Sequence, residues 1–255
     1  MLDDRSSAPI IIAPAFERGG CMRVLRGRLR DLDADRAVVS RMLDRAGDGE
    51  PSIRVWAPGR QVAFGRRDAR APGYDQARQI AQTAGFLSIE RSVGGHAVAY
   101  VETTLAFAYV RPIDDPREGL TDRYEAVTAR IQRALWDVGV PAQRGEPDDS
   151  FCPGSHSLSY YGKIVGIAQR VRGDAALVSG VVIVDGHEEI ARVLGPIYDA
   201  IGVPFDPDSV GSVERAGGTA DSGTVARAIE ERLVGSREPM FERVDEWLDE
   251  KPIEE

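Results

Sequence analysis

Three strand-like segments follow one another closely in the second half of the chain, and they constrain the fold more than any other feature. They span residues 157–161, 163–171 and 175–184. Gly162 separates the first two, and the pair Gly173-Asp174 stands between the last two. Glycine at so short a connection is typical of a tight turn between antiparallel strands. The sequence therefore predicts an antiparallel meander.

The rest of the chain mixes further strands with helices. Apolar residues recur at helical spacing over residues 33–46, 74–84, 120–138, 188–201, 224–234 and 239–250. Short strands are predicted over residues 23–29, 52–56, 61–64, 88–93 and 103–110, with a Pro58-Gly59 turn joining the second and third. Because helices and strands do not alternate regularly, we predict an α+β fold: a mixed, mostly antiparallel sheet with helices packed on it.

The chain divides into one large domain and two short flanks. We expect a domain over residues 22–235, a flexible or doubtful N-terminal extension over 1–21, and an acidic C-terminal helix or tail over 236–255. The apolar patch in the extension is too short for the core of a signal peptide, and Met22 is an alternative start of translation. No apolar run approaches the ~20 residues of a membrane span.

Charge and cysteine content narrow the class of protein. The chain carries 41 acidic and 32 basic residues, a net charge of -9, which argues against a general nucleic-acid binder. Its two cysteines, Cys21 and Cys152, lie far apart and suggest no disulfide framework. The three histidines, His96, His156 and His187, stand at no standard metal-ligand spacing, so no metal site is predicted. These features favour a cytoplasmic globular protein with neither a nucleic-acid nor a membrane partner.

One lysine stands out because almost every basic residue is arginine. Only Lys163 and Lys251 are lysines. Lysine can lose its proton and act as a base, whereas arginine cannot. By the period of two, Lys163 lies on the same strand face as Val165 and Ile167, where a charge is costly unless it is paired or used. A lysine that extends to solvent from a sheet edge is the alternative.

The opposite face of that predicted strand carries small residues, Gly166 and Ala168. Two small side chains in succession leave room for a ligand chain beside the strand. We therefore treat both residues as candidates for substrate binding.

Cys152 lies in a loop rich in proline and glycine, directly before the first strand of the meander. A cysteine there can be an exposed nucleophile, although an inert loop cysteine is the alternative reading. A reactive thiol needs a cationic or basic neighbour. His156 and Lys163 follow at four and eleven residues, and neither spacing establishes contact.

A paired glycine, Gly94-Gly95, interrupts residues 91–98 between two predicted strands. Glycine allows the backbone to approach a ligand closely, and its N–H groups can hold a carboxylate, a thioester oxygen or a phosphate. A simple hairpin turn is the other interpretation.

These stretches together resemble the superfamily of lipoate–protein ligases, octanoyltransferases and biotin–protein ligases. The resemblance rests on Arg91…Gly94-Gly95-x-Ala97-Val98 followed by Gly162-Lys163-Ile164-Val165-Gly166-Ile167-Ala168-Gln169, and it extends over roughly residues 23–235. It implies a catalytic domain with a class-II-synthetase-like fold. It also implies Cys152 and Lys163 as catalytic residues, with the acyl group and substrate held by Arg91, Gly94, Gly95, His96, Gly154, Gly166 and Ala168.

Within the superfamily, Phe151-Cys152-Pro153-Gly154 resembles the loop of the cysteine-dependent octanoyl-(H protein):protein amidotransferases. That resemblance implies an acyl–protein transferase that needs no cofactor. The donor would be the glycine-cleavage H protein or an acyl carrier protein, and the acceptor a lysine of the lipoyl domains of oxoacid dehydrogenase E2 subunits. The acyl group would pass through a thioester on Cys152, with Lys163 lowering the pKa of the thiol and moving protons.

Two alternatives remain. The first is an ATP- and Mg-dependent lipoate–protein ligase that needs a separate accessory protein, in which Cys152 is incidental. Such ligases usually carry a third glycine where this chain has His96. Because only a short stretch follows Val234, we expect no fused accessory domain. The second is a ligase-like fold that binds lipoyl domains without catalysis.

Overall fold

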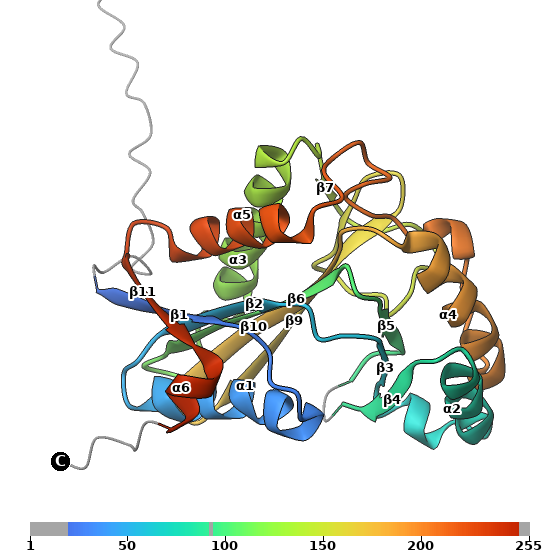
Figure 1. Cartoon of the computed structure of the whole chain (residues 1–255), viewed down its shortest axis with the longest axis horizontal. Coiled ribbons are helices and arrows are strands. Elements are labelled where there is room, and N and C mark those ends of the chain that lie inside the picture. Colours follow the sequence, from blue (N-terminus) through green and yellow to red (C-terminus); the bar gives the residue numbers. More distant parts are fainter. Residues whose placement is uncertain (1–19, 92–93, 250–255) are drawn as a thin grey trace, which may run out of the picture.

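The computed structural model describes residues 20–91 and 94–249, which form two sheets with helices packed against them (Figure 1). The larger sheet has eight strands in the order β11-β1-β2-β6-β10-β9-β8-β7, and the smaller has three in the order β4-β3-β5. The strands are β1 (Cys21–Arg26), β2 (Ser52–Trp56), β3 (Gln61–Phe64), β4 (Leu87–Glu90), β5 (Val98–Tyr100), β6 (Thr104–Pro112), β7 (Gln143–Arg144), β8 (Leu158–Ser159), β9 (Lys163–Arg172), β10 (Ala175–Ile183) and β11 (Glu238–Arg243).

Strand pairing confirms the predicted class. In the larger sheet β1 runs parallel to β2 and β11, and every other neighbouring pair is antiparallel. The predicted meander is present as β8, β9 and β10. The smaller sheet pairs β3 in parallel with β4 and antiparallel with β5. The fold is thus α+β, with mixed, mostly antiparallel sheets.

Within residues 20–91 and 94–249, six helices cover the sheets. They are α1 (Leu32–Gly47), α2 (Tyr74–Thr83), α3 (Leu120–Asp137), α4 (His187–Ile201), α5 (Ser222–Val234) and α6 (Val244–Asp249), with short 3-10 turns η2 (Asp68–Arg70) and η3 (Pro207–Ser209). The helices α3 and α5 lie on one face of the larger sheet and α1 and α6 on the other (Figure 1). The smaller sheet packs with α2 and α4 around a separate apolar cluster. Within the described residues, no helix is both long enough and apolar enough to cross a membrane.

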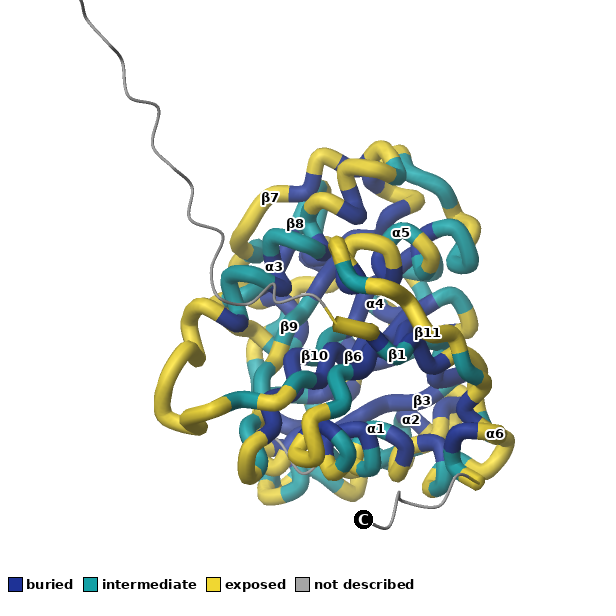
Figure 2. The backbone as a smooth tube through the Cα atoms, turned by 90° about the vertical axis from the view of Figure 1, so that its left-hand side faces the viewer, coloured by how far each residue is buried: buried dark blue, intermediate teal, exposed yellow. Residues whose placement is uncertain are grey.

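The buried residues concentrate in the central strands and in the helix faces turned toward them, whereas the edge strands β7 and β11 are largely exposed (Figure 2). Two of the helices begin at a side-chain N-cap. The carboxylates of Asp31 and Asp221 accept backbone N–H groups at the first turns of α1 and α5. Local sequence therefore sets these boundaries, and the first five predicted helices are confirmed.

The predicted pair of strands around Pro58-Gly59 is wrong as a pair, although both strands exist. β2 pairs with β1 and β6 in the larger sheet, whereas β3 pairs with β4 and β5 in the smaller one. The Pro58-Gly59 connection therefore crosses between sheets. The short strand β5 was not predicted. Both errors have the same cause, because the partner of a short strand is chosen by distant segments and not by its own sequence.

The predicted helix over residues 239–250 is wrong in its first half. Glu238–Arg243 form strand β11, which pairs with β1 along six residues, and only Val244–Asp249 are helical. An ion pair between Arg23 and Glu242 and the Arg26 guanidinium 4.2 Å from the Phe241 ring help to fix this edge. The C-terminal segment thus joins the sheet, while residues 250–255 and residues 1–19 of the predicted extension lie outside the described residues.

A buried ion pair ties α1 to β2. The Arg54 guanidinium, with no exposed area, donates to Asp35 at 2.5 Å and to the Gly27 carbonyl at 2.9 Å. Burial lowers the pKa of Arg54. The neighbouring Asp35 carboxylate raises it, but the effect of burial is the larger one. Removing the carboxylate alone leaves a buried charge without its counter-ion.

We therefore expect Asp35→Ala to lower the free energy of unfolding by about 3–5 kcal/mol. Adding Arg54→Met should recover a large part of that loss, because the second change removes the stranded charge. Chemical denaturation of wild type, single and double variants measures both effects. A single variant within about 1 kcal/mol of wild type would contradict the role given to the pair.

Candidate active site

Cys152 sits in a strained loop that precedes β8. Its backbone has a φ of +41°, in the left-handed region that non-glycine residues rarely adopt. The side chain is half-buried, and the preceding Phe151 is fully buried. A backbone conformation of this kind costs on the order of 1–3 kcal/mol and persists only where surrounding contacts impose it.

Lys163 supplies part of that constraint. Its side chain is 1% exposed, and Nζ donates to the carbonyl oxygens of Phe151 and Cys152, both at 2.9 Å, and to Glu146 Oε2 at 2.6 Å. These bonds use all three N–H groups of an ammonium. The predicted pairing of Cys152 with Lys163 is therefore made through the backbone of the loop, with no hydrogen bond to the thiol among the described contacts.

A bulge at the start of β9 determines where Lys163 points. Leu158 pairs with Val165 while the next residue, Ser159, pairs with Lys163, so one strand carries an extra residue, Ile164. An extra residue reverses the alternation of faces and can redirect a side chain. Ile164 and Val165 accordingly lie in the same core cluster.

The sequence prediction that Lys163 shares a face with Val165 and Ile167 is therefore wrong. Lys163 lies on the side of Gly166, where a Cβ atom would come within 3.5 Å of Lys163 Cε. Gly166 thus keeps space beside the lysine. Ala168, two residues on, is exposed, and Val165 is fully enclosed in the core.

Glu146 completes the support of the loop and was not found from the sequence. Its carboxylate accepts hydrogen bonds from the Gly154 N–H and the Ser157 hydroxyl, each at 2.7 Å, as well as from Lys163. Burial raises the pKa of Glu146, but the bonds from Lys163 and Ser157 outweigh it and hold the pKa below its usual value. The Gly154 N–H, predicted as a substrate contact, is already occupied by this carboxylate.

The paired glycine borders the thiol. Gly95 has a φ of +88°, and a Cβ atom there would lie 2.7 Å from Cys152 Sγ. On the other side, a Cβ atom at Gly65 would collide with the Gly95 carbonyl. Only glycine at both positions lets the backbone pass this closely, so the structure brings Gly95 and Cys152 together as the sequence suggested.

Arg91 is a cation in contact with the thiol. Its Nη2 lies 3.8 Å from Cys152 Sγ and donates to the His96 carbonyl at 2.5 Å. Burial lowers the pKa of Arg91, but interaction with Cys152 and Tyr100 reverses that effect and leaves the pKa raised. A guanidinium favours the thiolate form of a cysteine without competing for its proton. Arg91 thus lies beside the sulfur, a contact that the sequence analysis did not predict.

Tyr198 of α4 connects the two halves of the site. Its hydroxyl accepts the Cys152 N–H at 2.7 Å and donates to the Ala97 carbonyl at 2.9 Å. Burial, and then the nearby Cys152, raise the pKa of Tyr198, so the group remains a hydroxyl. The sequence gave no signal for this role, because Tyr198 falls on the apolar face of a helix like any core residue.

His96 is held by an acid that the sequence analysis also missed. Its Nδ1 lies 2.7 Å from Oδ1 of Asp68, which is 1% exposed and whose other oxygen accepts the Gly65 N–H at 2.9 Å. The His156 ring, by contrast, stacks on the Tyr124 ring with 4.0 Å between their centroids, and its Nδ1 lies 3.8 Å from Glu125 Oε1. Of the two histidines near the predicted motifs, His96 therefore belongs to the thiol site.

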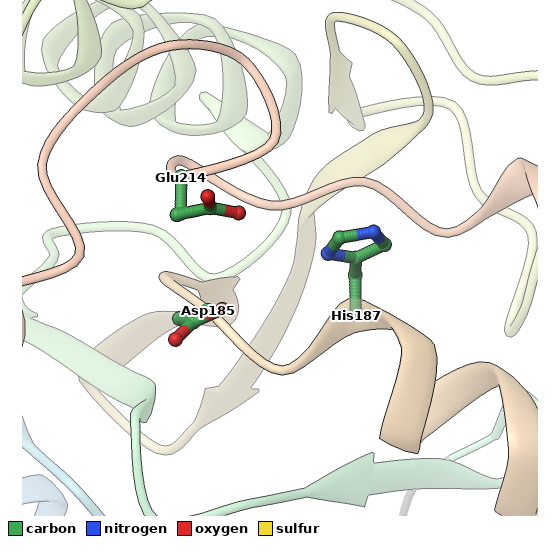
Figure 3. A group of neighbouring side chains, drawn as sticks. All are labelled: Asp185, His187 and Glu214. Carbon is green, nitrogen blue, oxygen red and sulfur yellow. The ribbon is translucent and has the colours of Figure 1, made fainter.

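A separate group of side chains has the composition of a metal site. Asp185, His187 and Glu214 approach one another at the end of β10 and the start of α4, with ligand atoms within 4.8 Å (Figure 3). Two carboxylates and an imidazole can hold a divalent cation. Spacing did not indicate this group, because backbone bonds from Val213 and Glu214 to the end of β10 assemble it from two distant segments.

The comparisons with known proteins agree with this geometry. Residues 30–231 match the sequence model of the lipoyl protein ligase A/B catalytic domain. The chain belongs to this family. The resemblance seen in the sequence is thereby confirmed.

Proteins similar in sequence to this lipoyl protein ligase A/B domain include several whose names describe them as acyltransferases. An octanoyl-[GcvH]:protein N-octanoyltransferase of Geobacillus kaustophilus is 32% identical over 134 residues, which are 52% of this chain and 47% of the relative. A lipoyl-[GcvH]:protein N-lipoyltransferase of Listeria monocytogenes is 28% identical over 138 residues, 54% of this chain and 50% of the relative. The chain spans about half the length of the curated relatives it matches.

Solved structures of the family confirm the fold. A lipoate-protein ligase A bound with ATP has a TM-score of 0.67 at 19% identity, covering 90% of this chain and 94% of its own. A bipartite lipoate protein ligase of Thermoplasma acidophilum has a TM-score of 0.59 at 17% identity, and the match covers 92% of this chain and 94% of the ligase chain. The domain therefore has the class-II-synthetase-like fold that the sequence implied.

The contact between Gly95 and the thiol predicts a sharp difference between the two glycines. Gly95→Ala should slow alkylation of Cys152 by iodoacetamide by about tenfold or more, because the new methyl group displaces the sulfur. Gly94→Ala is the matched control, since a Cβ atom there meets nothing within 4 Å. Equal rates in the two variants would show that Gly95 does not shape the site.

The lowered pKa of Glu146 predicts a pH-dependent contribution to stability. A depressed carboxyl pKa stabilises the fold above the ordinary value of about 4.3, and the stabilisation is lost as pH falls through the lower, folded-state pKa. The difference in unfolding free energy between wild type and Glu146→Gln should therefore be largest near neutrality and shrink in acid. Denaturation between pH 3 and 7 tests this, with the exposed Glu118→Gln as a control whose difference stays flat.

Proposed function

We propose that this domain is an acyl–protein transferase that moves an octanoyl or lipoyl group from a carrier protein to a lysine of a lipoyl domain through a thioester on Cys152. The observation that carries the proposal is the environment of the thiol. Cys152 Sγ lies 3.8 Å from the Arg91 guanidinium and borders the Gly95 backbone. A half-buried thiol with a permanent cation at one side is poised for nucleophilic attack.

The first step is attack of the Cys152 thiolate on the carbonyl carbon of the carried acyl group. Negative charge then develops on the acyl oxygen and requires hydrogen-bond donors. The N–H groups of Cys152 and Gly154 are already bonded to Tyr198 and Glu146. We therefore assign the oxyanion contact to the backbone of the Gly94-Gly95 turn, which borders the sulfur.

The acyl chain needs an apolar path away from the thiol. We assign it to the side of β9 that carries Gly166 and Ala168, where the absence of large side chains leaves room. Each buried methylene contributes about 0.8 kcal/mol, so an octanoyl chain can be held without polar contacts. Val165, which lies inside the core, is not part of this path.

The partners follow from the chemistry and from the names of the relatives. Two relatives are named for transfer to or from GcvH, and the Thermoplasma acidophilum structure contains a ligase with its E2 lipoyl domain. We propose the glycine-cleavage H protein as donor, with an acyl carrier protein as second candidate, and E2 lipoyl domains as acceptors. Exchange of one lysine amide for another, as from the H protein, is close to thermoneutral, and a thioester donor such as an acyl carrier protein already stores the energy for amide formation. Either route therefore needs neither ATP nor Mg, and it suits a cytoplasmic enzyme.

Intact-protein mass spectrometry tests the proposal directly. Wild type mixed with octanoyl-loaded H protein in the absence of ATP should gain one octanoyl group, and Cys152→Ala should gain none. Cys21→Ser is the matched control, since it removes the other cysteine, which is exposed and on β1. Modification of a lipoyl domain only in the presence of free lipoate, ATP and an accessory protein, and undiminished in Cys152→Ala, would establish the ligase instead.

A further inference from the structure

The loop between β3 and α2 carries three arginines that the proposed chemistry does not use (Figure 1). Arg66, Arg67 and Arg70 are all exposed. Within residues 20–91 and 94–249, none of their guanidinium groups has a carboxylate or hydrogen-bond partner. Other exposed arginines do pair, as Arg232 does with Asp137. In a chain of net charge -9, three unpaired cations so close in sequence are a local excess of positive charge.

The acid within this segment does not offset that charge, because it is turned inward. Asp68 is 1% exposed, and its Oδ2 accepts the Gly65 N–H at 2.9 Å. A backbone bond also fixes the turn, since the Ala69 N–H donates to the Gly65 carbonyl at 3.2 Å. The buried carboxylate therefore anchors the loop, and the side chains that it presents to solvent are cationic.

The loop is joined to the thiol site through two glycines. Arg66 directly follows Gly65, and a Cβ atom on Gly65 would collide with the Gly95 carbonyl. Gly95 in turn borders the Cys152 sulfur, which lies 2.7 Å from the position of a Cβ atom there. A folded domain that brings an acylated lysine to this thiol must cover the surface around it. The arginine loop belongs to that surface.

We infer that Arg66, Arg67 and Arg70 form a docking surface for a carrier domain that presents carboxylates around its modified lysine, an inference that rests on the proposed transferase function. Exposed charges of opposite sign speed the encounter of two proteins and orient it, while they add little to the stability of the complex. Arginine suits this task because its guanidinium stays charged and can bind a carboxylate through two N–H groups. The acidic balance of the whole chain argues against a nucleic acid as the occupant.

A docking surface acts on the encounter and not on the reaction at sulfur. A small neutral donor reaches the thiol without docking, so its rate should not depend on the arginines. A protein donor should depend on them most at low salt, because charges interact over ~30 Å at about 0.01 M salt and over only ~8 Å at about 0.15 M.

The choice of donor and salt provides the test. We would measure acylation of Cys152 by octanoyl-loaded H protein and by the neutral thioester octanoyl-N-acetylcysteamine, using intact-protein mass spectrometry at about 0.01 M and about 0.15 M salt. In Arg67→Gln/Arg70→Gln, the second-order rate with the H protein should fall about tenfold at low salt and only about twofold at the higher salt. The rate with the thioester should equal that of wild type. Arg66 is kept, because its neighbour Gly65 packs against the Gly95 turn.

Arg117→Gln/Arg133→Gln is the matched control. It removes two exposed arginines, before α3 and on it, whose side chains also lack partners in the described part of the chain. If Arg67→Gln/Arg70→Gln loses no more rate with the H protein than this control, loses it equally at both salt concentrations, or slows the small thioester as much, the inference is overturned while the transferase stands. If wild type forms no adduct with either donor, the proposed function itself fails and takes the inference with it.

Discussion

The site is organised around one buried ammonium group. Lys163 is almost wholly enclosed, and a charge removed from water is stable only where acceptors surround it. Its acceptors are two carbonyls of the Cys152 loop and the Glu146 carboxylate, which also binds the far side of that loop. A loop that moved away would leave an uncompensated charge in the interior, at a cost of several kcal/mol. The ammonium therefore maintains the left-handed backbone at Cys152.

The thiol lies where the two sheets meet. The larger sheet supplies Lys163 at the bulged start of β9, while the smaller sheet supplies the Gly94-Gly95 turn between β4 and β5. Tyr198 from α4 is bonded to both sides, through the Cys152 N–H and the Ala97 carbonyl. A shift between the sheets would break these bonds together, so the packing of α4 contributes directly to the geometry of the nucleophile.

The charged groups around the thiol have different tasks. The best stabiliser of a thiolate is a cation that never gives up its proton, and Arg91 has that property. Lys163 holds the Cys152 loop in place through its three N–H groups.

Sequence alone determined the local elements and the identity of the chemical groups. Helical spacing fixed α1 to α5, glycine turns fixed the meander, and the glycine pair, Cys152 and Lys163 were all marked by their residue types. What the tertiary structure decided was every relation between distant segments. It assigned β2 and β3 to different sheets, placed β11 beside β1, reversed the face of Lys163 through one extra residue, and brought in Glu146, Tyr198 and Asp68. The physical reason is that hydrogen-bond partners and burial depend on which remote backbone is adjacent, whereas spacing along the chain records only what lies within a turn or two.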